Sequence, residues 1–239
     1  AAKLQLREVE INDAKAEDIQ WLSLSTWPEV AGVLTSKNKG LQFLDDEQNV
    51  LHQIQGQFGR FDYRIGAERL LIATSNLQQQ QIQLLSMNLQ NKTWDKSVFI
   101  PKRTFKSEDV CLYTDPQGLS FAFLVGEEGI GEQWLVANHE KALEQPKLVR
   151  RLSFPPASSV CKVNDATAEL FINEANVGVW AYPAYSEADM VRQVVDLVEP
   201  FGSIKGTPSA IAIVDDQVAV FDEEKPLLYR YQKQDKHWN

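Results

Sequence analysis

The sequence predicts an all-β protein, a β-propeller of about five recognisable blades. Short apolar runs alternate with turn residues along the whole chain, which is typical of strands joined by hairpins. Four segments with one shared strand pattern begin at Phe61, Val110, Val160 and Ala210, at intervals of 49, 50 and 50 residues. A repeat of this length that carries three to four strands is typical of a propeller blade.

In chain order, the blades are expected to start near residues 20, 60, 109, 159 and 209 of a single domain over residues 1–239. The last copy has three clear strands, at residues 210–214, 218–221 and 227–231. An N-terminal strand over residues 4–11, where apolar and polar residues alternate, would close the last blade and remove an exposed edge. A β-sandwich or two small β-domains is the alternative architecture.

Helical periodicity is scarce, and its best example is ambiguous. Ser186 and Asp189 could form the start of a capped helix over residues 186–195. The same residues equally predict a short turn that leads into a strand at residues 193–197. The sequence leaves both alternatives open.

Composition limits the classes of partner. The 239 residues are 44% hydrophobic, enough to bury a substantial core, and 10% aromatic, which excludes intrinsic disorder. The 24 basic and 33 acidic residues give a net charge of −9, whereas nucleic-acid and anionic-membrane binding need Lys and Arg. No apolar run approaches the roughly 20 residues of a membrane helix. We therefore expect neither a nucleic acid nor a membrane as partner.

The two cysteines occupy matching positions in successive repeats. Cys111 and Cys161 lie 50 residues apart, on expected inner strands of adjacent blades, and lack the spacing of metal ligands. A disulfide needs Cα atoms within roughly 7 Å. The sequence does not decide whether they are bridged, and two buried free thiols are the favoured state.

Four stretches carry a family resemblance. They are Leu34-Thr-Ser-Lys-Asn-Lys-Gly-Leu-Gln-Phe-Leu-Asp, Phe61-Asp-Tyr-Arg, Ala73-Thr-Ser-Asn, and Phe121-Ala-Phe-Leu-Val-Gly-Glu-Glu-Gly-Ile-Gly-Glu-Gln-Trp. They resemble segments of the β-propeller phytases, which hydrolyse inositol hexakisphosphate with calcium. The resemblance runs from about residue 17 to about residue 231 and implies an incomplete relative of a six-bladed propeller.

The chain departs from the family pattern at positions that carry charge. The family's Lys-Glu pair in the third-blade hairpin is Glu127-Glu128, its Arg after Ser-Asn is Leu77, and its calcium-ligand segment becomes residues 158–163. The family's final blade, with its Asp-rich calcium loop, has no counterpart. The resemblance therefore implies the incomplete N-terminal domain of a dual-domain bacterial phytase, non-catalytic or weakly active, that assists a C-terminal catalytic domain.

The candidate site residues follow from the resemblance, and no catalytic residue is assigned. Phosphate-binding candidates are Lys37, Lys39 and Arg64, and candidate calcium ligands are Asp18, Asp62 and Glu128. The side chains at positions 62 and 64 share one face of a strand, so a structural ion pair between them is the favoured role. Phosphate contact by Arg64 is the more specific alternative. Calcium binding is expected to be weak or absent.

Two other functions stay open. One is an active calcium-dependent 3-phytase, a phosphomonoester hydrolase, and the other is a protein-interaction propeller without phosphate binding. Inositol phosphate is the expected ligand both of an active 3-phytase and of the assisting domain. The resemblance implies a periplasmic or secreted protein.

Overall fold

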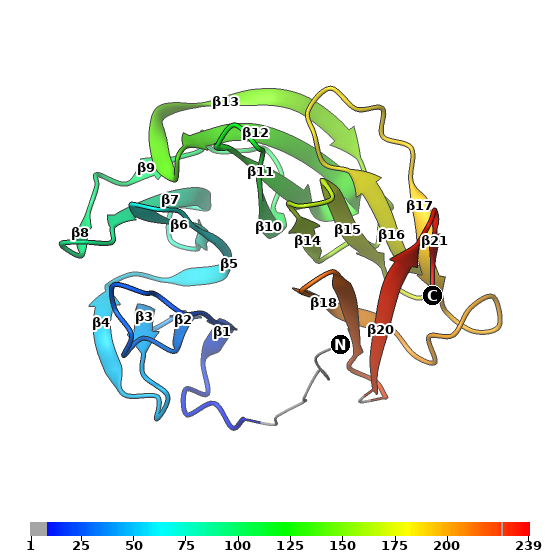
Figure 1. Ribbon diagram of the computed structural model, residues 1–239, viewed down its shortest axis with the longest axis horizontal. Coiled ribbons are helices and arrows are strands. Elements are labelled where there is room, and N and C mark those ends of the chain that lie inside the picture. Colours follow the sequence, from blue (N-terminus) through cyan, green and yellow to red (C-terminus); the bar gives the residue numbers. More distant parts are fainter. Residues whose placement is uncertain (1–8, 226) are drawn as a thin grey trace. The chain divides into compact units, whose positions relative to one another are not determined.

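The protein is built almost entirely of β-strands, in a computed structural model that describes residues 9–225 and 227–239 (Figure 1). The strands form five antiparallel sheets, in each of which neighbours along the chain pair with one another. The first sheet contains β1 (Ala16–Trp21), β2 (Gly32–Ser36), β3 (Gly40–Leu44) and β4 (Val50–Ile54). The second contains β5 (Phe58–Ile65), β6 (Arg69–Asn76), β7 (Gln81–Asn88) and β8 (Thr93–Trp94), with β9 (Val98–Phe99) also on β7.

The remaining three sheets repeat the same order. The third contains β10 (Ser107–Thr114), β11 (Leu119–Gly126), β12 (Ile130–Asn138) and β13 (Lys141–Ser153), with the one-turn 3-10 helix η1 (Glu127–Gly129) between β11 and β12. The fourth contains β14 (Cys161–Asn164), β15 (Glu169–Glu174), β16 (Gly178–Pro183) and β17 (Gln193–Leu197). The fifth contains β18 (Pro208–Val214), β19 (Gln217–Asp222), β20 (Leu227–Gln234) and β21 (His237–Trp238). Five successive meanders of this kind confirm the predicted all-β propeller class.

The chain divides into two compact units. Unit 1 comprises residues 1–59 and 76–78, with the sheet β1–β4, and unit 2 comprises residues 60–75 and 79–239. Within unit 2, the first strands β10, β14 and β18 lie on the inner side and the last strands β13 and β17 on the outer side (Figure 1). The single-domain assignment stays a prediction.

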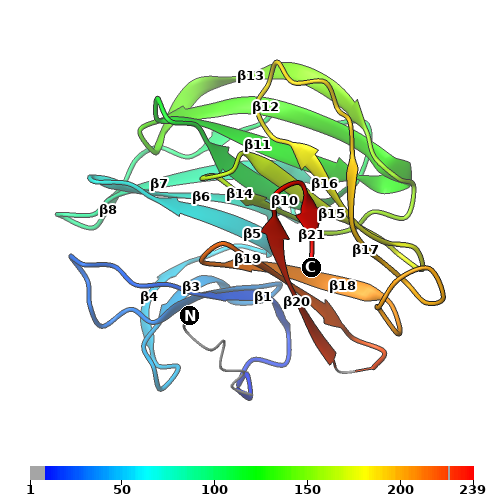
Figure 2. The same ribbon diagram turned by 45° about the vertical axis from the view of Figure 1, so that its right-hand side comes forward.

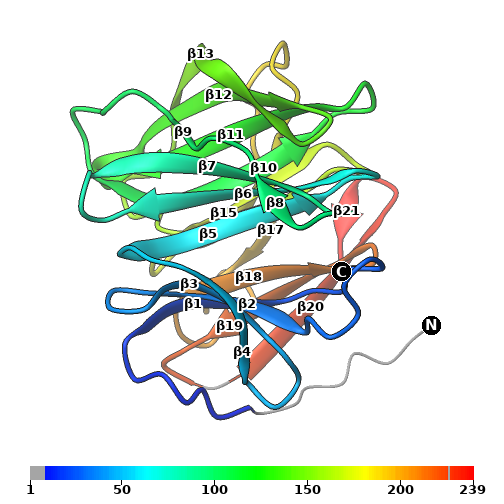
Figure 3. The same ribbon diagram turned by 90° about the vertical axis from the view of Figure 1, so that its left-hand side faces the viewer.

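The core of unit 2 lies between successive sheets. One apolar cluster joins β6 and β7 to β10–β12. The ribbons of these cyan and green strands are seen in Figure 3. A second cluster joins β10 and β11 to β14–β16, which lie beside them in Figure 2, and a third joins the fourth sheet to the fifth. Because such strands are covered on both faces, β11 is buried along nearly all of its length, whereas the outer β13 is not.

Two local predictions can now be compared with the structure. Residues 186–192 contain no helix and lead into strand β17, which confirms the turn-and-strand alternative. Of the expected strand at 4–11, residues 4–8 lie outside the described residues, and 9–11 form no strand. No helix in the described part of the chain is long and apolar enough to cross a bilayer.

Candidate functional site

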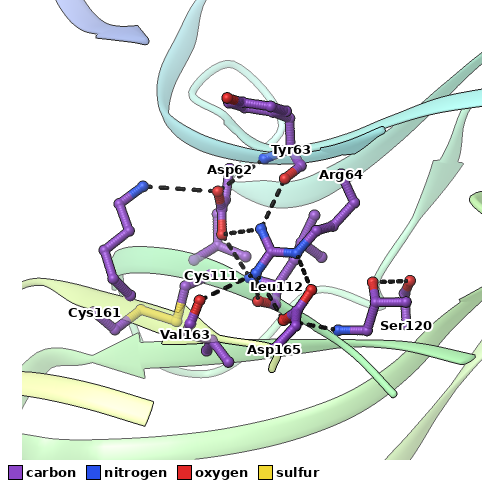
Figure 4. A network of polar contacts seen from close by, with 12 residues as sticks. Asp62, Tyr63, Arg64, Cys111, Leu112, Ser120, Cys161, Val163 and Asp165 are labelled. Atoms are coloured by element: carbon purple, nitrogen blue, oxygen red, sulfur yellow. Dashed lines mark hydrogen bonds and ion pairs between the residues drawn. A yellow bond between two sulfur atoms is a disulfide. The ribbon is translucent and has the colours of Figure 1, made fainter. Parts of the chain in front are cut away.

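The inner strands of unit 2 bring a network of charged side chains together (Figure 4). Asp62 and Arg64 project from β5, Cys111 and Leu112 belong to β10, and Asp165 directly follows β14. These strands each open a sheet, and β10 contacts β14. Residues that are 50 to 101 positions apart in sequence therefore meet at this level of the fold.

Arg64 holds the three strands together. Its Nε donates to Asp165 Oδ2 at 2.7 Å and its Nη2 to Asp165 Oδ1 at 3.1 Å, a two-point contact with one carboxylate. Its Nη groups also donate to the backbone carbonyls of Tyr63, Leu112 and Val163. Burial would lower the pKa of Arg64, but the charges of Asp62 and Asp165 raise it, so the guanidinium stays charged.

Asp62 links β5 to β10 through the backbone. Its Oδ2 accepts the N–H of Leu112 at 2.8 Å and lies 3.4 Å from Arg64 Nη1, while its Oδ1 lies 3.7 Å from Lys162 Nζ. Burial would raise the pKa of this carboxyl. The charges of Lys162 and Arg64, with the backbone N–H donors of Leu112 and Tyr63, hold the pKa below its ordinary value. The predicted ion pair between Asp62 and Arg64 is confirmed.

Asp109 makes an equivalent link from β10 to β14. Its Oδ2 accepts the N–H of Cys161 at 3.0 Å, its Oδ1 accepts the N–H of Val110 at 2.9 Å, and Arg60 Nε lies 3.2 Å from Oδ1. Burial raises the pKa of Asp109, and the nearby Arg60 and Lys162 charges only partly oppose it. We call these two carboxylate-to-backbone links, from Asp62 and from Asp109, the interblade brackets.

The two cysteines are bridged. Cys111 and Cys161 form a disulfide with Cα atoms 6.0 Å apart, and both side chains are buried. The expectation of two free thiols is therefore wrong. The bracket from Asp109 explains the error, because it links β10 to β14 at Cys161 itself and brings the matching positions within bridging distance.

The network balances its charges. The cations Arg60, Arg64 and Lys162 contact the three carboxylates, which are Asp62, Asp109 and Asp165. Every one of these contacts joins different strands or strand ends, except the pair on β5. Opposite charges that neutralise one another in this way stabilise the arrangement of the strands and leave little net field to attract an anion.

The other two predicted phosphate-binding residues belong to unit 1. Lys37 and Lys39 occupy the turn between β2 and β3 in unit 1, where Lys37 Nζ is 3.2 Å from Glu17 and Lys39 Nζ is 3.9 Å from Asp13. Arg64 belongs to unit 2, and its N–H groups donate hydrogen bonds to acceptors of the protein itself. A role in phosphate binding stays a prediction for all three residues.

The predicted calcium ligands belong to three different sheets or their connecting turns. Asp18, on β1, accepts a hydrogen bond from Gln20 at 3.2 Å, and Glu128 lies in η1 with a φ of 57°. Calcium requires six to eight oxygen ligands. The surroundings of Asp62 instead supply two cations, a donor set that does not fit this ion. Among residues 9–225 and 227–239, no group of three or more His, Cys, Asp or Glu side chains could hold a metal ion.

Sequence reasoning missed four of the six charged residues in the network, namely Arg60, Asp109, Lys162 and Asp165. One signal was present, because Asp109 follows Asp62 by 47 residues, close to the repeat interval. No comparable signal marks Asp165, which meets Arg64 from 101 residues away.

Successive antiparallel meanders, cross-linked at their first strands, define a β-propeller. The phytase family model matches residues 9–204, and the chain belongs to this family. No curated protein matches the chain. Among solved structures, the Cps50 (Swd1) β-propeller domain of Myceliophteria thermophila is similar, with a TM-score of 0.53 and 8% identity over 96% of this chain and 87% of that one. This likeness shows the fold alone.

Proposed function

We propose that this member of the phytase family is a non-catalytic or weakly active propeller module that assists hydrolysis of inositol hexakisphosphate by a following catalytic domain. The observation that carries the proposal is the commitment of the inner-strand charges to one another. Arg64 is bound to Asp165, and Asp62 accepts Leu112 N–H beside Lys162. Groups with these partners hold strands together, whereas phosphoryl transfer needs cations aimed at substrate oxygens.

The proposed contribution to substrate binding is weak and lies outside this network. Lys37 and Lys39 are the candidates, since both side chains are at least half exposed and their carboxylate partners are at the edge of hydrogen-bond distance or beyond. Calcium would assist only weakly, because the carboxylate of Asp62 lies between two cations. A periplasmic or secreted location is part of the proposal, and the disulfide supports it because disulfides persist in oxidising compartments.

Phosphate release tests the proposal directly. The purified chain, with inositol hexakisphosphate and calcium, should release phosphate at the rate of the enzyme-free control. The same chain fused to a catalytic phytase domain should raise phosphate release above that of the catalytic domain alone. Clear turnover by the isolated chain would overturn the non-catalytic assignment, and equal rates with and without it would overturn the assisting role.

Substitutions separate a binding role from a structural one. The double variant Lys37→Ala, Lys39→Ala should abolish the stimulation while the thermal midpoint stays unchanged, because both lysines are exposed. Lys147→Ala, an exposed lysine on β13, is the matched control and should retain the stimulation. Stimulation that survives the double variant would exclude these lysines from substrate binding.

An active calcium-dependent 3-phytase is the second candidate, favoured by the family match over residues 9–204. Turnover by the isolated chain is the outcome that selects it.

A protein-interaction propeller is the third candidate function. Calorimetric titration with inositol hexakisphosphate and calcium that detects no binding, either to the chain alone or to the fusion, would select this reading.

A further inference from the structure

The disulfide lies inside the charged network (Figure 4). Cys111 directly precedes Leu112, whose N–H donates to Asp62 and whose carbonyl accepts from Arg64. Cys161 donates its own N–H to Asp109 and directly precedes Lys162. The covalent bond therefore joins the two strands at the level where the brackets and the arginine act.

Arg64 depends on both bridged strands at once. Its guanidinium donates to the Leu112 carbonyl on β10 and, at 3.5 Å, to the Val163 carbonyl on β14. Asp165, one residue beyond β14, accepts both from Arg64 and from the N–H of Thr114 on β10. A change in the separation of β10 and β14 would therefore move the acceptors of one guanidinium apart.

We propose that the Cys111–Cys161 disulfide is a latch that pre-organises the Arg64 contacts, so that its reduction loosens the joint between the third and fourth sheets. The bond holds the two Cα atoms 6.0 Å apart. This fixes the separation of the Leu112 and Val163 carbonyls, so that these acceptors are in position before Arg64 binds them. Because both cysteines are buried, a dithiol reaches the bond only when the joint opens, and reduction then breaks the S–S bond and forms two S–H groups. The dithiol supplies two electrons and two protons and is itself oxidised to a disulfide.

The reduced thiols would stay in apolar surroundings. Both sulfurs belong to a buried cluster that includes Phe123 and Ile172, and free thiols pack well in such cores. Reduction is therefore expected to leave the fold in place and to act on the dynamics of the joint. The bracket from Asp109 would still connect β10 to β14, without the covalent restraint.

Thiol counting and hydrogen exchange test the latch in the unmodified protein. Denatured, unreduced chain should show no free thiol, and two thiols would overturn the proposal. After reduction, exchange of the backbone amides of Leu112, Thr114 and Cys161 should accelerate at least about tenfold. Exchange in β6 and β7 should change much less. Unchanged exchange at the three amides would show that the bond is not a latch.

A double-mutant cycle tests the coupling to Arg64. Arg64→Met keeps the apolar stem and removes the donors. Its effect on the folded-to-unfolded ratio should be about tenfold smaller in the Cys111→Ala, Cys161→Ala background than in the disulfide-bonded protein. Val125→Ala is the matched control, because it removes volume from the same apolar cluster and leaves the bond. The Arg64→Met effect should be unchanged there.

Each outcome of the cycle is decisive. Additive effects in the cysteine-free background would refute the coupling. If the Arg64→Met effect were reduced as much in the Val125→Ala background as in the cysteine-free one, general destabilisation rather than loss of the disulfide would explain the reduction. If the cysteine-free protein fails to fold, exchange of the reduced wild-type chain decides the question.

Discussion

Asp62→Ala should destabilise unit 2 strongly, because it removes a carboxylate that four groups contact. The substitution takes away the acceptor of the Leu112 and Tyr63 N–H groups and deprives Lys162 and Arg64 of a carboxylate. An unsatisfied buried amide costs about 1–3 kcal/mol, and removal of one partner of a buried ion pair costs about 3–5 kcal/mol in total. Arg64 keeps Asp165, so we expect about 3 kcal/mol, more than about a 100-fold change in the folded-to-unfolded ratio.

Urea unfolding at pH 7, followed by far-ultraviolet circular dichroism, measures this loss. Glu68→Ala is the matched control, because that side chain is 84% exposed and its pairing with Arg69 at 4.0 Å is worth little. The control should stay within about 0.5 kcal/mol of wild type. A loss below about 1 kcal/mol for Asp62→Ala, with an unchanged urea slope, would refute the bracket assignment.

Acid unfolding supplies an independent readout of Asp62. The pKa of this carboxyl is below its ordinary value of 3.8 in the folded protein. The folded state therefore binds its proton less tightly than the unfolded state, and the stabilisation is present above about pH 4 and lost as the pH falls through the folded pKa. Asp62→Asn should lack this part of the acid transition. Identical acid transitions for the variant and wild type would contradict the contacts of Asp62.

Three further predictions concern other positions. The pKa of Asp109 is raised, so the folded state binds this proton more tightly than the unfolded state, and wild type should gain stability relative to Asp109→Asn as the pH falls from 7 to 4. Urea midpoints measure this difference, and a loss of stability instead of a gain would contradict the inference that burial disfavours the charged carboxylate. Gly129→Ala should cost about 2 kcal/mol or more, seen as a lower thermal midpoint, because φ is +80° and a Cβ would meet the Phe154 carbonyl oxygen. Arg192→Met should lose the cation–π contact with Trp180, at 3.7 Å from the ring centroid, and cost about 0.5–1 kcal/mol by urea unfolding; no loss would show that the contact is energetically neutral.

The fold could be predicted because its signals are local and periodic. Apolar runs mark the strands, turn residues separate them, and the interval near 50 residues identifies the sheets. The pairing of Asp62 with Arg64 was equally accessible, since alternate residues of a strand share a face. Glu128 was placed correctly in a hairpin turn, and the structure adds its left-handed φ of 57°.

The rest of the site depends on how neighbouring sheets are placed against one another. Asp165 meets Arg64 across 101 residues, and no local pattern indicates which carboxylate lies opposite a given arginine. The disulfide depends on the same placement, because a shift of one residue between β10 and β14 would separate Cys111 from Cys161. Sequence periodicity predicts that such strands exist but not their mutual register.

The interblade brackets have a consequence for how folding cooperates along unit 2. The link from Asp62 to Leu112 spans 50 residues and the link from Asp109 to Cys161 spans 52. Each therefore closes a loop about the length of one repeat, and its entropic cost is recovered only when two consecutive sheets are both formed. In such a chain, the stability of each sheet depends mainly on its interfaces with the sheets next to it. Damage to one sheet should consequently weaken the sheets on either side of it first and fade with each further repeat.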